Sequence, residues 1–296
     1  MKSARPAPQL GIKNLGITFN TLRKLLKFAL LEDGAWHDRT TQATISPQLW
    51  ARGEIRAKES GVLAGIPLVK IIYQLLDPRC KVTALKQEGV RFKKDEKVAV
   101  LLGPSRALLS GERLSLNFLS RLSGVATLTR QFSDQVGQDR IYDTRKTTPL
   151  LRSLERYAVR VGRGNNHRFN LAGHVLIKDN HLNLGGGVTA CVKAARKKYG
   201  LQEFIEVEVE NLKEALEAVE SGADIILVDN ASPKLFHEII KKVRGRIQIE
   251  TSGGLTLKNI RRYAKLPVDR FSSGSLTHSA PSIDFSMALF PKVLSK

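Results

Sequence analysis

Five cationic side chains form three short groups in the middle of the chain, and their types suit the binding of a small polyanion. The groups are Arg145-Lys146, His167-Arg168 and Lys178. Arginine holds carboxylates and phosphates through two parallel hydrogen bonds, and lysine and histidine add positive charge. Each group alone is explained more simply as a surface ion pair or as a loop beside a helix. Their meaning therefore depends on the elements that bring them together.

Two acids and two glycine-containing segments follow the cations along the chain. Glu208 and Asp229 are carboxylates of the kind that bind sugar hydroxyls. In the segments 251–254 and 273–275, glycine lets backbone N–H groups approach a phosphate. A single Ser-Gly-Gly or Ser-Gly-Ser is more often an ordinary turn. The combination of cations, acids and glycine turns predicts a phosphorylated ligand that also carries hydroxyl groups.

An alternation of strand-like and helix-like segments predicts where these groups lie. The strand-like segments are short, apolar and β-branched, and each ends in a polar residue; they are 140–143, 175–178, 204–208, 224–229, 246–250 and 269–273. Strand ends from Glu208 to Ser272 recur every 21 or 22 residues, and between them lie helix patterns such as 211–220, with Gly222 as a stop. Loops converge at the carboxyl ends of parallel strands. We therefore predict an α/β barrel or an open parallel sheet with the ligand site at that edge.

The first half of the chain has a different pattern, which predicts a separate α+β domain. A helix is expected at 21–31, and short alternating runs separated by Gly and Pro predict strands at 51–57, 81–86 and 97–102. A helical stretch at 111–122 is expected to bridge to the second domain.

Length and composition suit a globular enzyme of the cytoplasm with one large domain or two ordinary ones, and the different pattern of the two halves favours two. The chain has 296 residues, and we predict an N-terminal domain at 1–116, joined by 281–296, and a barrel domain at 117–280. The first residues are expected to be a loose tail, with no secretory signal and no apolar run that could cross a membrane. Cys80 and Cys191 are far apart and lack metal-ligand spacing, which argues against a zinc site.

The net charge of +20 raises nucleic acid as a partner. Clusters such as 196–198 and 241–244 are not interleaved with aromatic residues, so a solvated helix surface explains them better. Basic residues inside loops are explained more economically by a small polyanionic substrate. Binding of nucleic acid is therefore kept as a minor alternative.

Seven segments that contain these groups follow one another in an order that is specific as a set. They are 111–117, 122–127, 143–147, 164–168, 176–181, 206–210 and 227–230. Together they resemble the quinolinate phosphoribosyltransferase family, also called nicotinate-nucleotide pyrophosphorylase (carboxylating). The likeness runs from about Leu31 to Ser286 and covers nearly the whole chain.

The resemblance implies a fold, an assembly and a substrate pocket. The implied fold is an incomplete α/β barrel of the type II phosphoribosyltransferase kind with an N-terminal α+β domain. The implied assembly is a homodimer with a shared active site, which could associate further. The residues that match the family's quinolinate pocket are Arg145, Lys146, His167, Arg168 and Lys178, with Arg113 of the partner subunit.

The resemblance also implies a site for phosphoribosyl pyrophosphate. Glu208 and Asp229 match the acids that hold the ribose hydroxyls and Mg²⁺, and with Lys146 they are the expected catalytic residues. The residues that match the phosphate-binding loops are Ser252, Gly253, Gly254, Gly274 and His278.

The implied reaction agrees with these residue types. Arginine and lysine can hold the two adjacent carboxylates of quinolinate, so that its ring nitrogen points at the sugar carbon. Magnesium and basic groups stabilise the departing pyrophosphate, and no protein nucleophile is required. Loss of carbon dioxide then leaves nicotinate mononucleotide. The enzyme would be a pentosyltransferase of NAD biosynthesis.

Three positions depart from the family's usual pattern. The family has glycine where this chain has Arg163, between Gly162 and Gly164, and where it has Leu150 after Pro149. We expect Arg163 to point outward. The usual glycine before Asp38 is also replaced, by His37. A related phosphoribosyltransferase of the molybdenum-operon type, acting on another acceptor, is the main alternative, although Arg145, Arg168 and Lys178 argue against it.

Overall fold

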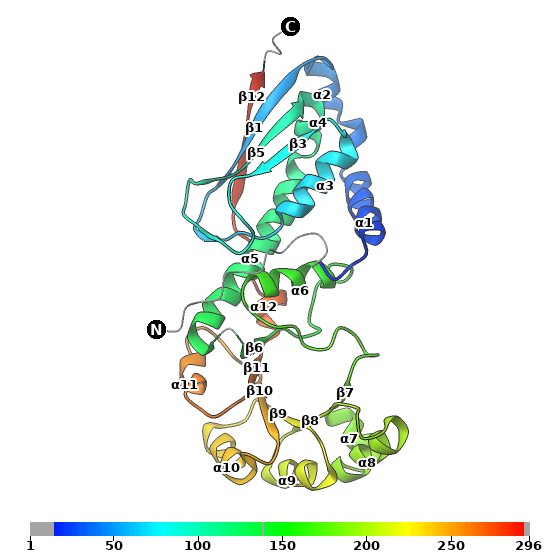
Figure 1. The fold of residues 1–296 in the computed structure, drawn as a ribbon, viewed down its shortest axis with the longest axis vertical. Coiled ribbons are helices and arrows are strands. Elements are labelled where there is room, and N and C mark those ends of the chain that lie inside the picture. The colour runs from blue at the N-terminus through cyan, green and yellow to red at the C-terminus, as the bar shows by residue number, and fades with distance from the viewer. Residues whose placement is uncertain (1–14, 138, 293–296) are drawn as a thin grey trace. The chain divides into compact units, whose positions relative to one another are not determined.

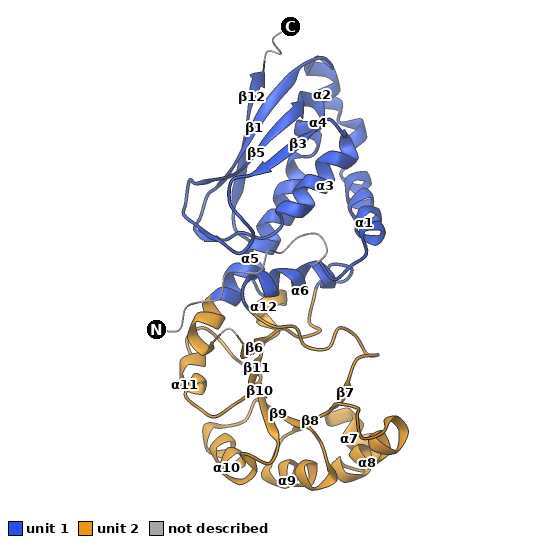
Figure 2. Cartoon of the chain, in the orientation of Figure 1, with its two compact units in different colours: residues 1–130, 148–163, 279–296 blue, residues 131–147, 164–278 orange. Residues whose placement is uncertain are grey.

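The computed structural model describes residues 15–137 and 139–292, which form two compact units (Figures 1 and 2). Unit 1 contains residues 1–130, 148–163 and 279–296, and unit 2 contains residues 131–147 and 164–278. The tail expected at the N-terminus lies outside the described residues. Among the described helices, none combines the length and apolar character that crossing a membrane needs.

These units divide the chain at other residues than the expected boundary between 116 and 117. Helix α5 (Glu112–Val136) is continuous past that point, so no break in secondary structure marks the expected boundary. Helix α6 (Arg152–Val161) belongs to unit 1 because its Glu155 is fully buried and pairs with Arg121 of α5 at 2.8 Å. Contacts between segments distant in the sequence set these limits.

Unit 1 is built on a four-stranded antiparallel sheet. Its order is β12 (Phe285–Lys292), β1 (Trp50–Ala57), β5 (Lys97–Pro104) and β3 (Lys81–Ala84). All three strands expected in the first half are therefore confirmed. Strand β12 pairs with β1 along its whole length, so this segment near the C-terminus belongs to the same sheet as the strands of the first half. The core beneath the sheet contains the buried side chains of Ile55, Tyr73, Leu101 and Leu119.

Helices complete unit 1. They are α1 (Phe19–Glu32), η2 (Ala35–His37), α2 (Arg39–Thr44), α3 (Ile66–Leu76), α4 (Ser105–Ser110), the first part of α5, and α6, and a second small sheet pairs β2 (Gly61–Val62) with β4 (Arg91–Phe92). The expected helix at 21–31 is α1, whose side chains at Leu22, Leu26 and Leu30 form one buried stripe. Asp38 caps the start of α2, where its carboxylate accepts a hydrogen bond from the Thr41 backbone N–H at 3.0 Å.

Unit 2 is an incomplete α/β barrel, as the sequence predicts. Its parallel sheet has the order β6 (Ile141–Tyr142), β11 (Arg270–Ser272), β10 (Gln248–Ser252), β9 (Ile225–Asp229), β8 (Ile205–Val209) and β7 (Val175–Ile177). All six expected strands are present, and β6 and β7 form the two edges of the described sheet. The strands follow an arc with helices along its outer side (Figure 1).

The helices of unit 2 alternate with these strands. They are α7 (Asp179–Gly185), α8 (Val188–Tyr199), α9 (Leu212–Ser221), α10 (Pro233–Val243), α11 (Ile260–Ala264) and α12 (Ser275–His278). Helix α9 agrees with the predicted segment 211–220: the Asn211 side chain accepts a hydrogen bond from Glu214 N at its start, and Gly222 ends it with a φ of 86°.

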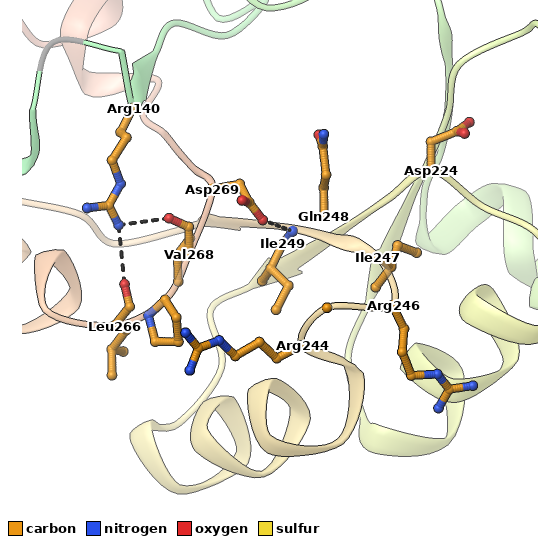
Figure 3. Close-up of a pocket in the computed structure, with 12 residues that line it drawn as sticks. Arg140, Asp224, Arg244, Arg246, Ile247, Gln248, Ile249, Leu266, Val268 and Asp269 are labelled. Carbon is orange, nitrogen blue, oxygen red and sulfur yellow. Dashed lines mark hydrogen bonds between the residues drawn. The ribbon is translucent and has the colours of Figure 1, made fainter.

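The amino ends of the strands border a hollow of about 750 Å³ (Figure 3). There the guanidinium of Arg140 donates hydrogen bonds to the backbone carbonyls of Leu266 and Val268 at 3.2 and 2.8 Å. The carboxylate of Asp269 accepts a hydrogen bond from Ile249 N at 2.8 Å. These charged side chains form hydrogen bonds with backbone groups near the starts of the strands. The residues around this hollow therefore contribute to the stability of the fold.

The two basic clusters expected on helix surfaces lie in the last turns of α8 and α10. Lys197, Lys198, Lys241 and Lys242 are exposed, as expected. Most of the net positive charge, however, belongs to unit 1, because the acids of unit 2 offset much of its positive charge.

Candidate active site

A cavity of about 610 Å³ opens at the carboxyl ends of the parallel strands of unit 2. All the predicted site residues except Arg113 line it; they are Arg145, Lys146, His167, Arg168, Lys178, Glu208, Asp229, Ser252, Gly253, Gly254, Gly274 and His278. Arg113 lies exposed on α5 in unit 1. Groups that are far apart in the sequence therefore share one cavity, because each follows or precedes a strand of the same sheet.

Asp143 joins the first two cationic groups into one structure. This fully buried residue follows β6, and its two carboxylate oxygens accept hydrogen bonds from His167 N at 2.8 Å and from the Asn166 side-chain amide at 2.5 Å. The loop that carries His167 and Arg168 is thereby held against the loop that carries Arg145.

Arg145 and Arg168 both line the cavity, and their positive charges act on one another. Partial burial lowers the pKa of Arg168, and the positive charge of Arg145 lowers it further. Arg168 also donates a hydrogen bond to the His174 carbonyl at 3.2 Å, which fixes its direction. Two like charges held together in a partly dry site are stabilised by an anion that binds both.

The loop around Gly274 is shaped by its close approach to Lys146. A Cβ atom at Gly274 would lie 2.8 Å from Cδ of Lys146 and 3.0 Å from the His278 ring, so a larger residue there would displace both. The Thr277 hydroxyl donates a hydrogen bond to the Lys146 carbonyl at 2.7 Å and ties the two loops together. Only glycine leaves space at this wall of the cavity.

The turn after β10 also requires glycine. Gly253 has a φ of +84°, and a Cβ atom there would lie 2.8 Å from the backbone nitrogen of Asn230. Gly254 also adopts a positive φ, of +56°. Gly253 and Gly254 therefore bring main chain, without side chains, to the cavity lining.

The acids Glu208 and Asp229 stand at the ends of neighbouring strands. Lys178 forms an ion pair with Glu208, whose side chain is mostly buried. Asp229 accepts a hydrogen bond from the Asn230 side chain at 2.9 Å. Carboxylate oxygens are ligands that Mg²⁺ prefers, usually together with the phosphates of a substrate. This donor set therefore fits a magnesium ion.

A cluster of buried charged groups near the floor of the cavity is not evident from the sequence. His167 Nε2 lies 3.0 Å from an oxygen of Glu206 and 3.5 Å from an oxygen of Glu250, and His174 Nε2 lies 3.1 Å from the same Glu206 oxygen. Both glutamates are 0% exposed. The sequence contains one indication of Glu206. It lies two residues before Glu208 on β8, and alternate residues of a strand share one face of the sheet.

The two buried glutamates differ in their charge balance. Burial alone would raise the pKa of Glu206, but His167 and His174 outweigh burial and hold this pKa below its ordinary value. Burial raises the pKa of Glu250, and the negative charge of Glu206 raises it further. Burial opposes the charged form of His167, but Glu206, Glu250 and Asp143 raise its pKa overall. His174 and Glu206 together with His167 also offer a spacing that could ligate a metal ion.

Two of the departures noted in the sequence lie at unusual backbone positions. Leu150 and Arg163 have φ values of 66° and 68°, a region that favours glycine. Neither is among the described residues that line the cavity. The backbone conformation therefore explains why the family has glycine at these two positions. Leu150 and Arg163, which stand there in this chain, do not change the lining of the cavity.

Comparison with known protein families identifies both parts of the chain. Residues 38–123 match the family model described as "Quinolinate phosphoribosyl transferase, N-terminal domain", and residues 125–288 match the model for the C-terminal domain of the same family. The two matches together cover most of the sequence.

Related proteins and solved structures agree with this match. A probable nicotinate-nucleotide pyrophosphorylase (carboxylating) of Bacillus subtilis is 43% identical over 270 residues, which are 90% of this chain and 92% of that protein. The human nicotinate-nucleotide pyrophosphorylase (carboxylating) is 39% identical over 80% of this chain and 81% of its own length. The crystal structure of NadC from Streptococcus pyogenes superposes with a TM-score of 0.89 and 40% identity, covering 94% of this chain and 99% of that chain.

Proposed function

Because the chain belongs to the quinolinate phosphoribosyltransferase family, we propose that it transfers the phosphoribosyl group of phosphoribosyl pyrophosphate to quinolinate with loss of carbon dioxide. The products are nicotinate mononucleotide, pyrophosphate and carbon dioxide, in a step of NAD biosynthesis. One observation carries the proposal: a single cavity of unit 2 joins cations for a dicarboxylate, acids for a ribose and glycine turns for phosphates.

Quinolinate fits the cationic side of this cavity. The adjacent guanidinium groups of Arg145 and Arg168, with Lys178 and His167, can hold two neighbouring carboxylates in one orientation. Holding both carboxylates fixes the plane of the pyridine ring and directs its nitrogen toward the sugar carbon. The binding step thus prepares the geometry of the transfer step.

Phosphoribosyl pyrophosphate fits the other side. The main chain of Ser252, Gly253, Gly254 and Gly274, with His278, can receive its phosphates. Glu208 and Asp229 would hold the ribose hydroxyls and a Mg²⁺ ion bound to the diphosphate. When bound, this ion supplies positive charge that stabilises the leaving pyrophosphate.

The transfer proceeds without a protein nucleophile. The bond from the sugar carbon to pyrophosphate breaks, and positive charge that develops on the ribosyl ring is stabilised by Glu208 and Asp229. The ring nitrogen of quinolinate forms the new bond, and Lys146 neutralises negative charge near the departing oxygens. The carboxylate next to the quaternary nitrogen then leaves as carbon dioxide, its electron pair stays on the ring, and a proton replaces it.

An assay with quinolinate, phosphoribosyl pyrophosphate and magnesium tests the activity. We expect nicotinate mononucleotide and carbon dioxide in equal amounts, and loss of turnover when a chelator removes magnesium. Absence of both products would contradict the proposal. Turnover of another heterocyclic acid in place of quinolinate would instead favour the molybdenum-operon alternative. Salt-sensitive retention on DNA or RNA, with no effect of Lys146→Ala, would favour the nucleic-acid alternative.

The proposal includes a homodimer in the cytoplasm whose active sites each receive Arg113 of the partner subunit. Its support is that Arg113 is exposed on α5 and lies outside the cavity lining of its own chain. We expect the Arg113→Ala and Lys146→Ala variants each to be nearly inactive. Mixed and allowed to exchange subunits, they should regain about one quarter of the wild-type activity, because half of the dimers carry one intact site.

A mixture that stays inactive after subunit exchange is confirmed would contradict the shared site, and so would an Arg113→Ala variant with wild-type activity. Arg23→Ala, at another exposed helical arginine of unit 1, is the matched control and should retain activity in the assay without mixing.

A further inference from the structure

One ion pair of unit 1 is bonded to the ends of two segments that line the cavity. Glu155 of α6 is 0% exposed, and its carboxylate pairs with Arg121 of α5 at 2.8 Å. Neither residue is among those that line the cavity. A buried carboxylate needs hydrogen-bond partners for both of its oxygens. The further partners of this pair belong to neither α5 nor α6.

Glu155 holds the end of the segment that carries Arg145 and Lys146. One carboxylate oxygen accepts a hydrogen bond from the Thr148 hydroxyl at 2.8 Å, and the other accepts one from the Thr148 N–H at 3.0 Å. Thr148 follows Lys146 by only two residues. The residue between them, Thr147, donates from its backbone N–H to the Arg145 carbonyl at 2.9 Å, which forms a tight turn. A fixed Thr148 therefore restricts the position of Lys146.

Arg121 holds the end of the second segment. Its guanidinium donates a hydrogen bond to the Ala280 carbonyl at 3.0 Å. Ala280 follows His278 by two residues, and His278 ends α12 and lines the cavity. The same guanidinium donates to Glu155 from Nε and Nη2 at 3.1 and 2.8 Å, which fixes the plane of the group. One ion pair therefore anchors both segments.

The two anchored segments also contact each other at the cavity. The Thr277 hydroxyl bonds to the Lys146 carbonyl at 2.7 Å, and Gly274 leaves space for the Lys146 side chain beside His278. The proposed function places the departing pyrophosphate at this wall. The spacing of Lys146 and His278 therefore depends on contacts at the cavity and on the anchored ends of both segments.

We propose that Arg121 and Glu155 form a positioning pair for phosphoribosyl transfer, which keeps Lys146 and His278 at the spacing that the departing pyrophosphate requires. Both act through other residues, since neither lines the cavity. The inference rests on the proposed function, which places Lys146 near the departing oxygens. Negative charge grows there mainly in the transition state, so displacement of Lys146 lowers kcat more than it raises the KM of either substrate.

An apolar replacement of the pair separates positioning from stability. Arg121→Met combined with Glu155→Leu leaves no unpaired buried charge but removes the bonds to Thr148 and Ala280. We expect kcat to fall by about 100-fold, because a misplacement of about 1 Å has an effect of this size. The KM of each substrate should change by less than about threefold. Calorimetry of quinolinate binding counts the folded sites, and kcat is expressed per site.

Smaller changes at Thr148 leave the ion pair intact and, because Thr148 is exposed, should leave the protein folded. Thr148→Val removes the hydroxyl that donates to Glu155 and keeps the shape of the side chain. We expect kcat to fall by about 5-fold to 10-fold. Thr148→Ser keeps a hydroxyl and should restore kcat to within about twofold of the wild type. If the double variant does not fold, these two variants decide.

Arg196→Met combined with Asp224→Leu is the matched control. This pair of unit 2 has the same nitrogen–oxygen distance of 2.8 Å, and Arg196 also donates to a backbone carbonyl, that of Gly222 at 3.1 Å. Neither residue lines the cavity at the carboxyl ends of the strands. We expect a lower melting temperature with an unchanged kcat per site. An equal fall of kcat in both double variants would overturn the inference.

Failure of the inference can be told apart from failure of the proposed function. If the wild type forms no nicotinate mononucleotide, the proposed function is wrong. If Lys146→Ala has the kcat of the wild type, the placement of Lys146 is wrong. If Lys146→Ala is nearly inactive but Thr148→Val and the Arg121→Met, Glu155→Leu variant keep the wild-type kcat, only the positioning role is wrong.

Discussion

The two ends of the parallel strands in unit 2 use charged side chains in opposite ways. At the amino ends, Arg140 donates hydrogen bonds to backbone carbonyls, and Asp269 accepts a hydrogen bond from the Ile249 N–H. Each of these charged side chains therefore has a backbone partner in the same chain. At the carboxyl ends, Arg168 donates one hydrogen bond to the His174 carbonyl, but burial and the like charge of Arg145 both lower its pKa. Charged side chains that form hydrogen bonds with the backbone, such as Arg140 and Asp269, stabilise the fold. The like charges of Arg145 and Arg168 disfavour one another until an anion binds, so they are suited to a ligand.

Arg168→Ala should give the largest effect, and it acts at the carboxyl ends. We expect kcat/KM for quinolinate to fall by about 100-fold to 1,000-fold, since a bidentate, charge-assisted contact is lost, with little change in the melting temperature. Steady-state kinetics and thermal unfolding measure the two quantities. Arg246→Ala, at an exposed arginine near the amino ends, should leave both unchanged. A similar loss of activity in both variants would remove the contrast between the two ends.

Arg140→Met should give the converse result at the amino ends. Methionine keeps much of the apolar contact with Phe271 but leaves the carbonyls of Leu266 and Val268 without their donor. We expect the free energy of unfolding to fall by about 2 to 3 kcal/mol, with kcat/KM of the folded protein unchanged. Urea denaturation and kinetics provide the measurements, with the exposed Arg262→Met as control. A fall in kcat/KM without loss of stability would show that this end also serves the reaction.

Leu150→Gly should give the smallest effect, which is on stability. Leu150 lies at neither end of the unit 2 strands. Leu150 is 88% exposed and has a φ of 66°, so glycine relieves backbone strain without removing buried contacts. We expect stability to rise by at most about 1 kcal/mol, because the unfolded chain also gains freedom. Leu171→Gly, at an exposed leucine that is not among the positive-φ residues, should give no gain in the same denaturation experiment. Equal changes of stability in Leu150→Gly and Leu171→Gly would contradict the interpretation that the backbone at Leu150 is strained.

The strands of unit 2 were predictable because each is a short apolar run bounded by polar residues. The same rule places Lys178, Glu208 and Asp229 at one edge of the sheet, and the structure brings them into one cavity. The division into units was not predictable in the same way. Helix α5 continues through the expected boundary, and α6 joins unit 1 through the pairing of Glu155 with Arg121. Such contacts join residues far apart in the sequence.

The buried cluster shows the same limit within the site. Glu206 lies in the segment 206–210, which resembles the family, and Glu250 ends a predicted strand. Their neighbours in the sequence do not show whether either side chain is buried or exposed to solvent. Only the folded sheet removes both from water and places them on one imidazole.

The sequence by itself determined which residue types stand at the strand ends, and so the kind of ligand that this edge can bind. Strand and helix patterns are local, so the order of cations, acids and glycine turns could be read directly. The tertiary structure alone decided which of these groups lose their water and which like charges meet. Ionisation depends on burial and on distances through space, and these exist only once the chain has folded.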